Sequence, residues 1–285
     1  MGALSVGVPG TVAGLWKAHQ ERGSLPWEQL VAPAIKLARE GIPITYSLQS
    51  GFLRNKSRFD LYPSSQQKFF KADGSSYELG ELWVQEDLAH TLELIQKNGR
   101  DGFYKGENAK RLADFMAANG GIITEEDLEL YQPVEREPVR GTYRGYEIVS
   151  MPPPSSGGVA LIQMLNILEG YDVGAMGHNS SAYLHVLTES MRRAYADRAE
   201  HLGDPDFNEA MPISRLMDKD YAAKQRATID MAKADISDPS KFAAPYESEE
   251  TTHFSVVDKD GNMVSMTYTL EYGYGSAIVV AGGGY

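Results

Sequence analysis

Apolar side chains recur every three or four residues through the first two thirds of the chain, and this spacing predicts amphipathic helices. In the first of these, Leu30, Ala34 and Leu37 form one stripe, and Gly41 stands where helices commonly end. Similar helices are expected at 85–98, 107–119, 124–131 and 182–202. A further helix at 159–168 is apolar nearly all round, which predicts a buried position.

Alternation of apolar and polar residues predicts strands in two places. Residues 140–151 alternate as one strand, and the three prolines that follow enforce an extended segment. Closer to the C-terminus, 253–257 and 262–269 alternate on either side of Asp260-Gly261, a pair typical of tight hairpin turns. The sequence therefore predicts a β-hairpin that begins near residue 251.

Residues 229–250 separate the helices from this hairpin and show neither periodicity. They contain Asp238-Pro239 and Pro245 and end in the acidic run 247–250. Such a composition is typical of an exposed linker, so we expect an acidic linker over these residues.

The charge balance and the absence of cysteine narrow the classes of function. The 285 residues include 27 Lys and Arg against 39 Asp and Glu, a net charge of −12, which argues against a nucleic-acid partner. Without cysteine there are no disulfides, thiolate metal sites or cysteine nucleophiles. No apolar run is long enough to span a bilayer, and residues 1–16 lack the cationic start of a signal peptide, so neither element is expected in this chain.

Metal and phosphate sites find little support in the sequence. The six histidines show no close ligand spacing, so we expect no metal site. The glycines within 7–14 do not match a phosphate-binding loop. Ser155 and Ser156 open the apolar helix, where backbone N–H groups could bind an anion; the simpler interpretation is that Ser156 caps the helix by accepting a first-turn N–H.

Thr251 and Thr252 stand where the acidic linker meets the hairpin. A threonine hydroxyl becomes a useful nucleophile when a base lies beside it, and cleavage just before the threonine would supply its own α-amine as that base. The simpler interpretation is two β-branched residues that begin a strand. The residues alone leave both interpretations open.

The segment Thr251 to Asp258 resembles the start of the small subunit of the γ-glutamyltranspeptidases, or glutathione hydrolases. Other motifs resemble the same family in the same order, at 8–14, 103–106, 120–121, 143–146, 151–158, 195–198, 202–205 and 244–248. Because the resemblance extends over essentially the whole chain, the sequence is identified as a member of this family.

The resemblance implies an α+β fold, the four-layer αββα sandwich of the N-terminal-nucleophile hydrolases, incomplete at both ends in this chain. Residues 1–250 would be the C-terminal part of the large-subunit segment, mostly helical and ending in the acidic linker 229–250. Residues 251–285 would be the N-terminal part of the small-subunit segment. The family cuts itself, and the matching position here lies between Glu250 and Thr251; the two subunits then stay paired.

Residue roles follow from the same resemblance. Thr251 would be the nucleophile, Thr269 would hydrogen-bond to it, and Glu271 would hold the α-amino group of the substrate. The implied substrates are glutathione and related γ-glutamyl amides, with an acceptor amine or water, and no metal or cofactor is needed. The family usually lies outside the cytoplasm, so a periplasmic or extracellular location is expected.

The chain departs from the family pattern at both ends. The family arginine for the substrate carboxylate lies upstream of Met1; the substrate-binding aspartate, the paired serines and the oxyanion glycines lie beyond Tyr285. We therefore expect a central part of a longer protein, inactive by itself. The alternatives are a cephalosporin or glutaryl-type acylase of the same fold, against which Glu271 argues because a glutaryl group has no ammonium, and a non-catalytic remnant.

Overall fold

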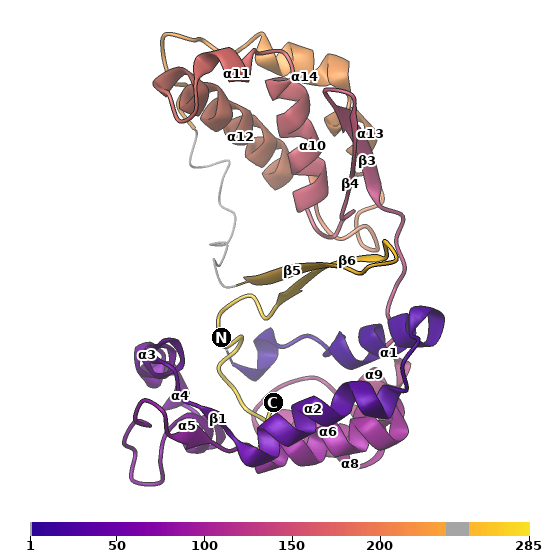
Figure 1. Ribbon diagram of the computed structural model, residues 1–285, viewed down its shortest axis with the longest axis vertical. Helices are drawn as coiled ribbons and strands as arrows, with labels where there is room; N and C mark the ends of the chain where they lie inside the picture. Colours follow the sequence, from indigo (N-terminus) through magenta and orange to yellow (C-terminus); the bar gives the residue numbers. More distant parts are fainter. Residues whose placement is uncertain (1, 238–250) are drawn as a thin grey trace. The chain divides into compact units, whose positions relative to one another are not determined.

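The computed structural model describes residues 2–237 and 251–285. These residues divide into two compact units, drawn with their elements in Figure 1. Unit 1 comprises Met1–Val134 and Ser248–Tyr285, and unit 2 comprises Glu135–Glu247. This division reflects which residues pack together, and it does not test the subunit boundary expected between Glu250 and Thr251. Glu250 lies outside the described residues.

Unit 1 is mostly helical and holds two of the three two-stranded sheets of the described residues. Its elements, in chain order, are η1 Ala3–Ser5, α1 Thr11–Arg22, α2 Trp27–Glu40, β1 Ile42–Pro43, α3 Tyr46–Arg54, α4 Lys56–Phe59, α5 Pro63–Phe69, β2 Leu82–Trp83, α6 Glu86–Asn98, α7 Asp101–Tyr104, α8 Gly106–Ala118, α9 Glu125–Leu130, β5 Thr251–Val257 and β6 Met263–Thr269. Strands β1 and β2 pair antiparallel, as do β5 and β6.

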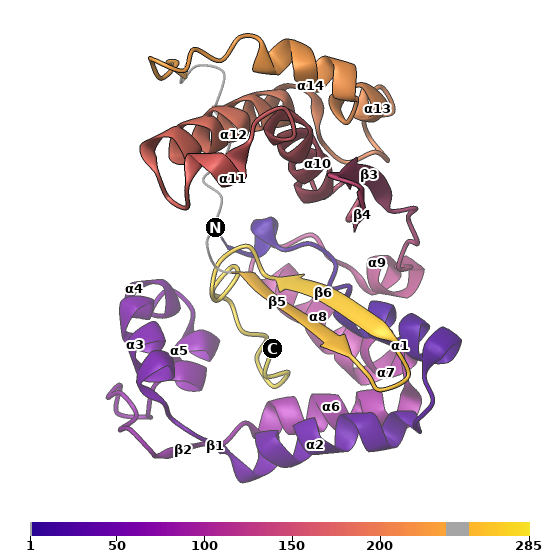
Figure 2. The ribbon, with the colours of Figure 1, turned by 45° about the horizontal axis from the view of Figure 1, so that its top comes forward.

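Helices α2 and α6 lie side by side, as Figure 2 shows. The Trp27 indole on α2 donates to the carbonyl oxygen of Ile95 on α6 at 3.0 Å. The expected stripe of Leu30, Ala34 and Leu37 is wrong as the buried face, since all three are exposed. Ile35 and Ala38 are buried instead. The spacing of Ile35 and Ala38 fits a helix as well as the spacing of the expected stripe does. Which of the two faces of α2 is buried depends on the side against which α6 packs.

The C-terminal segment of unit 1 runs through its core. Ala277 and Val279 belong to an aromatic-rich cluster, whose other buried members are Ile44, Phe52, Phe59, Phe69, Phe70 and Trp83. Ser65 Oγ on α5 donates to the Ala277 carbonyl at 2.7 Å and accepts from the Val279 amide at 3.0 Å. Val280 belongs to a second cluster around Tyr104. The segment that follows β6 is therefore fixed to helices more than 200 positions earlier in the sequence.

Unit 2 packs helices against a short hairpin (Figure 1). Its elements are β3 Val139–Tyr143, β4 Tyr146–Ser150, α10 Gly157–Leu168, α11 Val173–Met176, α12 Ser181–His201, α13 Ile213–Leu216 and α14 Lys219–Arg226. Helix α10 is largely buried, as its apolar sequence predicted. The single strand expected over 140–151 is wrong: β3 and β4 pair antiparallel, and the chain reverses at Arg144 and Gly145, which have φ of 49° and 87°.

A buried carboxylate joins three helices of unit 2. Asp197 on α12 accepts hydrogen bonds from Gln163 on α10 and from Gln225 and Tyr221 on α14. Burial, together with the Asp197 carboxylate, raises the pKa of the Tyr221 hydroxyl, so Tyr221 stays protonated and serves as a donor. These donors all come from helices that pack around Asp197. Their hydrogen bonds offset the free-energy cost of burying a carboxylate.

Only the first part of the expected acidic linker, residues 229–237, is described. Here the chain is mostly exposed but fastened to α12: His185 Nε2 lies 2.9 Å from the Asp230 carbonyl oxygen, and the Asp235 amide donates to Glu189 at 3.1 Å. The rest of the linker, 238–250, lies outside the described residues. Within 2–237 and 251–285, no helix is both long and apolar enough to cross a membrane.

Candidate active site

Strands β5 and β6 form the hairpin that the sequence predicted. The pairing sets Thr251, the first residue of β5, opposite Thr269, the last residue of β6. Thr251 Oγ1 donates a hydrogen bond to Thr269 Oγ1 at 3.1 Å. Two threonines 18 positions apart thus meet at the open end of the hairpin, and both are exposed.

The turn at the other end of the hairpin holds this pairing in register. Asp258 accepts from the backbone amides of Asp260 and Asn262 at 2.9 Å and from the Asn262 side chain at 2.8 Å. These hydrogen bonds, first the one from the Asn262 side chain, lower the pKa of the Asp258 carboxyl. Gly261 has φ of 85°, a conformation that glycine adopts at little cost.

Successive side chains of a strand point to opposite faces, and the two faces of this hairpin differ in chemistry. One face carries Thr251, Thr269 and a hydroxyl-rich cluster around His253. The His253 ring nitrogens lie 2.9 Å from Thr267 Oγ1 and 3.2 Å from Ser265 Oγ. The other face is mostly apolar, with Phe254, Val256, Val264, Met266 and Tyr268.

His253 was not among the site residues expected from the sequence, where it was one histidine among six. Its place two positions after Thr251 in an alternating strand could have indicated that both side chains share a face. The hydroxyl contacts of its ring come from both strands, and the turn brings those strands together.

Glu271 follows β6 by two positions and meets the threonine pair through its backbone. Its amide donates to Thr269 Oγ1 at 3.0 Å, so Thr269 Oγ1 accepts from both Glu271 and Thr251. The φ of Glu271 is 69°, a conformation uncommon for residues other than glycine. Its side chain is exposed. The structure therefore brings Thr251 and Thr269 together directly and places Glu271 beside them, whereas Glu250 lies outside the described residues.

The serines at the start of α10 make different contacts from those expected. Ser156 Oγ makes no capping hydrogen bond and accepts instead from Arg198 Nε on α12 at 2.7 Å. Ser155 Oγ accepts from the Gly157 amide at 3.3 Å. The cap predicted for Ser156 is therefore wrong, because an arginine distant in sequence takes its hydroxyl. Among the described residues, no cluster of three or more His, Asp or Glu side chains could hold a metal ion.

Comparison with known proteins identifies the family. The family model for gamma-glutamyltranspeptidase matches residues 1–285. The chain belongs to the γ-glutamyltranspeptidase family. It is 46% identical over 284 residues to a glutathione hydrolase proenzyme of Pseudomonas sp. (strain A14), and 45% identical over 284 residues to the glutathione hydrolase proenzyme of Escherichia coli (strain K12). Each alignment covers 99% of this chain and 49% of the relative, so the chain spans about half the length of these curated relatives.

Solved structures of this γ-glutamyltranspeptidase family and of an acylase share the fold. The γ-glutamyltranspeptidase of Helicobacter pylori superposes with a TM-score of 0.80 at 45% identity, over 86% of this chain and 69% of that one. The cephalosporin acylase of Bacillus halodurans superposes with a TM-score of 0.80 at 28% identity, over 99% of this chain and 52% of that one. These matches confirm the expected α+β N-terminal-nucleophile hydrolase class. The described residues contribute three two-stranded sheets to it.

Proposed function

We propose that this chain carries the nucleophilic centre of a γ-glutamyl acyl-transfer enzyme, with Thr251 as the attacking residue. The observation that carries the proposal is the 3.1 Å hydrogen bond between Thr251 and Thr269 on a hairpin whose register pairs them. Relatives at 45–46% identity are glutathione hydrolase proenzymes, which supports glutathione and similar γ-glutamyl amides as substrates.

The first reaction in this proposal is self-cleavage before Thr251. The Thr251 hydroxyl oxygen attacks the carbonyl carbon of Glu250, the peptide C–N bond breaks, and an ester joins the two residues. Water then hydrolyses the ester, which leaves a carboxylate on Glu250 and a free α-amine on Thr251. This amine, with an unperturbed pKa of about 8, would serve as the general base of the later steps.

The second reaction transfers the γ-glutamyl group. Thr251 Oγ1 attacks the γ-amide carbon while its α-amine takes the hydroxyl proton and passes it to the departing amine. Thr269 would steady the attacking oxygen, since its hydroxyl can rotate to donate as well as accept. The Glu271 carboxylate suits the substrate ammonium by charge. Water or an acceptor amine then releases the acyl group, with no metal or cofactor required.

We expect the 285-residue chain by itself to be a weak catalyst. By resemblance, its sequence holds no match for the oxyanion glycines, and losing one oxyanion donor typically lowers kcat by about 100- to 1,000-fold. Release of p-nitroaniline from a γ-glutamyl anilide should therefore be much slower than with a chain extended to the length of the curated relatives. Equal rates would contradict this assignment of the pocket. The resemblance also supports a periplasmic or extracellular site of action, which cell fractionation would test.

Intact mass after purification and prolonged incubation tests the self-cleavage step. A competent Thr251 yields two pieces whose masses place the cut between Glu250 and Thr251, and Thr251→Ala remains one chain. Thr252→Ala is the matched control, because Thr252 pairs with Tyr268 on the opposite face and should leave cleavage unchanged. Cleavage that persists in Thr251→Ala would refute the role of Thr251.

A second candidate, an acylase acting on glutaryl amides, is supported by two specific matches. An acylase proenzyme of Pseudomonas sp. (strain SE83) is 41% identical over 284 residues, and the Bacillus halodurans cephalosporin acylase shares the fold over 99% of this chain. The extended chain and its Glu271→Gln variant should be assayed with matched γ-glutamyl and glutaryl anilides. A loss confined to the γ-glutamyl substrate favours the first candidate; preference for the glutaryl substrate favours the acylase.

A further inference from the structure

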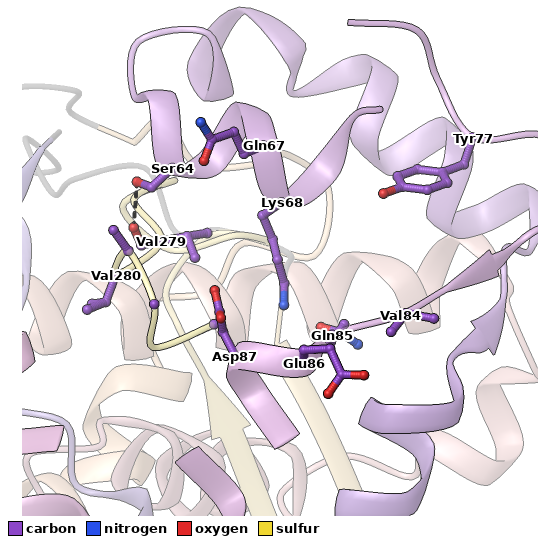
Figure 3. Close-up of a pocket in the computed structure, with 13 residues that line it drawn as sticks. Ser64, Gln67, Lys68, Tyr77, Val84, Gln85, Glu86, Asp87, Val279 and Val280 are labelled. Atoms are coloured by element: carbon purple, nitrogen blue, oxygen red, sulfur yellow. Dashed lines mark hydrogen bonds between the residues drawn. The ribbon is translucent and has the colours of Figure 1, made fainter. Parts of the chain in front are cut away.

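Unit 1 contains a cavity of about 280 Å³ between α5, the start of α6 and the C-terminal segment (Figure 3). None of Thr251, Thr269 and Glu271 lines it. Its lining residues are Ser64, Gln67, Lys68, Tyr77, Val84, Gln85, Glu86, Asp87, Val279, Val280, Ala281, Gly282 and Gly284. The cavity therefore offers chemistry that the acyl-transfer proposal does not use.

The C-terminal segment forms a fixed wall of this cavity. Ser64 Oγ donates to the Val279 carbonyl at 2.7 Å, a bond drawn in Figure 3. Thr91 Oγ1 on α6 donates to the Gly283 carbonyl at 2.8 Å. Gly284 lies so close to α6 that an added Cβ would overlap the backbone nitrogen of Leu88. The cavity is thus bounded by hydrogen-bonded backbone on this side.

Among the described residues that line the cavity, Lys68 supplies the one amine. Its backbone carbonyl accepts from the Trp83 indole at 2.9 Å, and its Nζ lies 5.5 Å from the centre of the same indole ring. Figure 3 shows the side chain extending from α5 across the cavity toward Asp87. The Trp83 indole therefore lies near both the backbone and the amine of Lys68.

Burial lowers the pKa of the Lys68 amine to about 8, and the negative charge of Asp87 opposes part of that shift. The other titratable groups that line the cavity are Glu86, on the first turn of α6, and Tyr77. Burial raises the pKa of the Tyr77 hydroxyl, so this group is neutral near pH 7.5. At that pH about a quarter of the Lys68 amine is neutral, compared with roughly 0.1% for an ordinary lysine.

We propose that Lys68 is a covalent capture site for small aldehydes within this cavity. The neutral amine attacks the carbonyl carbon, a C–N bond forms, and the carbonyl oxygen leaves as water to give an imine. The two carboxylates in the wall, Glu86 and Asp87, favour an aldehyde that is uncharged or cationic. The cavity, of about 280 Å³, has room for a small aldehyde.

Lys71 is a matched comparison within the same protein. It lies three positions after Lys68, and its Nζ forms an ion pair with Glu81 at 2.7 Å. This hydrogen bond raises the pKa of Lys71, so its neutral fraction is smaller than that of an ordinary lysine. Any reagent that reaches both amines reports their chemical difference directly.

The experiment treats the 285-residue chain with propanal and sodium cyanoborohydride, which reduces each imine to a stable alkylamine. Peptide mapping by mass spectrometry then gives the alkylation rate of each lysine and distinguishes lysine alkylation from alkylation of the N-terminal amine. The neutral fractions favour Lys68 over an ordinary lysine by roughly 250-fold at pH 7.5, and over Lys71 by more, because the pKa of Lys71 is raised. If intrinsic reactivity falls with pKa for amines as it does for thiols, the net preference over an ordinary lysine is roughly 15- to 25-fold.

A pH series and three variants decide the outcome. The Lys68 rate should level off above a midpoint near pH 8, and Asp87→Asn should move that midpoint lower because the opposing charge is removed. Lys68→Met should abolish this label and leave Lys71 unchanged, whereas Lys71→Met should leave Lys68 reactive. Equal rates at the two lysines, or a Lys68 midpoint near 10.5, would overturn the proposal.

Discussion

Replacing Ser65 with alanine should release the C-terminal segment from the core of unit 1. Ser65 is fully buried, and its hydroxyl bridges the Ala277 carbonyl and the Val279 amide. Alanine keeps the helix and the backbone space but leaves one buried acceptor and one buried donor without their partner. The segment in question directly follows β6, so its release also removes support from the end of the hairpin that carries Thr269.

The magnitude follows from the two orphaned groups. An unsatisfied buried polar group costs about 1–3 kcal/mol, so the pair should destabilise the docked segment by roughly 2–6 kcal/mol before water entry recovers part of that cost. Ser64→Ala is the matched control on the same helix. Ser64 is only half-buried and makes one bond, to the Val279 carbonyl, so its loss should cost about 0.5–1.5 kcal/mol. Both substitutions gain the same small helix propensity.

Hydrogen exchange measured by mass spectrometry reads this difference locally. A cost of 2 kcal/mol corresponds to about a 30-fold faster exchange in peptides that cover 274–285, if they exchange by local opening. Peptides from α10 and α12 in unit 2 should keep their rates. If Ser65→Ala and Ser64→Ala exchange alike in 274–285, the bridging hydroxyl does not hold the segment and the reasoning is wrong.

Three further predictions concern other parts of the chain. Thr269→Val removes one neutral hydrogen bond to the proposed nucleophile and should slow self-cleavage about 3- to 10-fold in an intact-mass time course; an unchanged rate would exclude its assistance. The pKa of the Asp258 carboxyl is lowered, so ionised Asp258 stabilises the turn above pH 3.8, and this contribution is lost as the pH falls through the folded-state pKa. Amide exchange at Asn262, corrected for its intrinsic pH dependence, should therefore become faster in acid. The Asp258→Asn variant should not show this pH dependence. Asp197→Asn places an amide opposite amide donors and should lower the stability of unit 2 by about 1–3 kcal/mol in urea, without faster exchange in unit 1.

Local signals in the sequence were enough to predict the main hairpin and the helices α2, α6, α8, α9, α10 and α12, whereas the other helices, including α1, α3 to α5 and α14, were not predicted. Spacing and flanking glycines predicted α6 and α8 within about two residues at each end, and alternation around Asp260-Gly261 predicted β5 and β6. The pairing of Thr251 with Thr269 follows once the turn is placed, because an antiparallel register fixes every opposite pair. The pairing of these two threonines was therefore accessible from sequence.

Features that depend on distant partners were not accessible in this way. The turn at Arg144-Gly145 lacks the usual asparagine or aspartate, so two strands read as one. The hydroxyl of Ser156 meets Arg198, and no local rule indicates an arginine on another helix. The Lys68 cavity depends on packing between α5, α6 and residues near the C-terminus, and the burial that changes its amine arises only in the folded chain.

Two adjacent threonines with the same side chain are not equivalent in this hairpin. Thr251 lies opposite Thr269, and Thr252 lies opposite Tyr268 on the other face. Removing one residue from the 258–262 turn could shift the strand pairing by one position and exchange the two threonines. Which of the two threonines faces Thr269 therefore depends on the number of residues in the turn between the strands. The residue type of the proposed nucleophile decides this only in part, because both positions hold threonine.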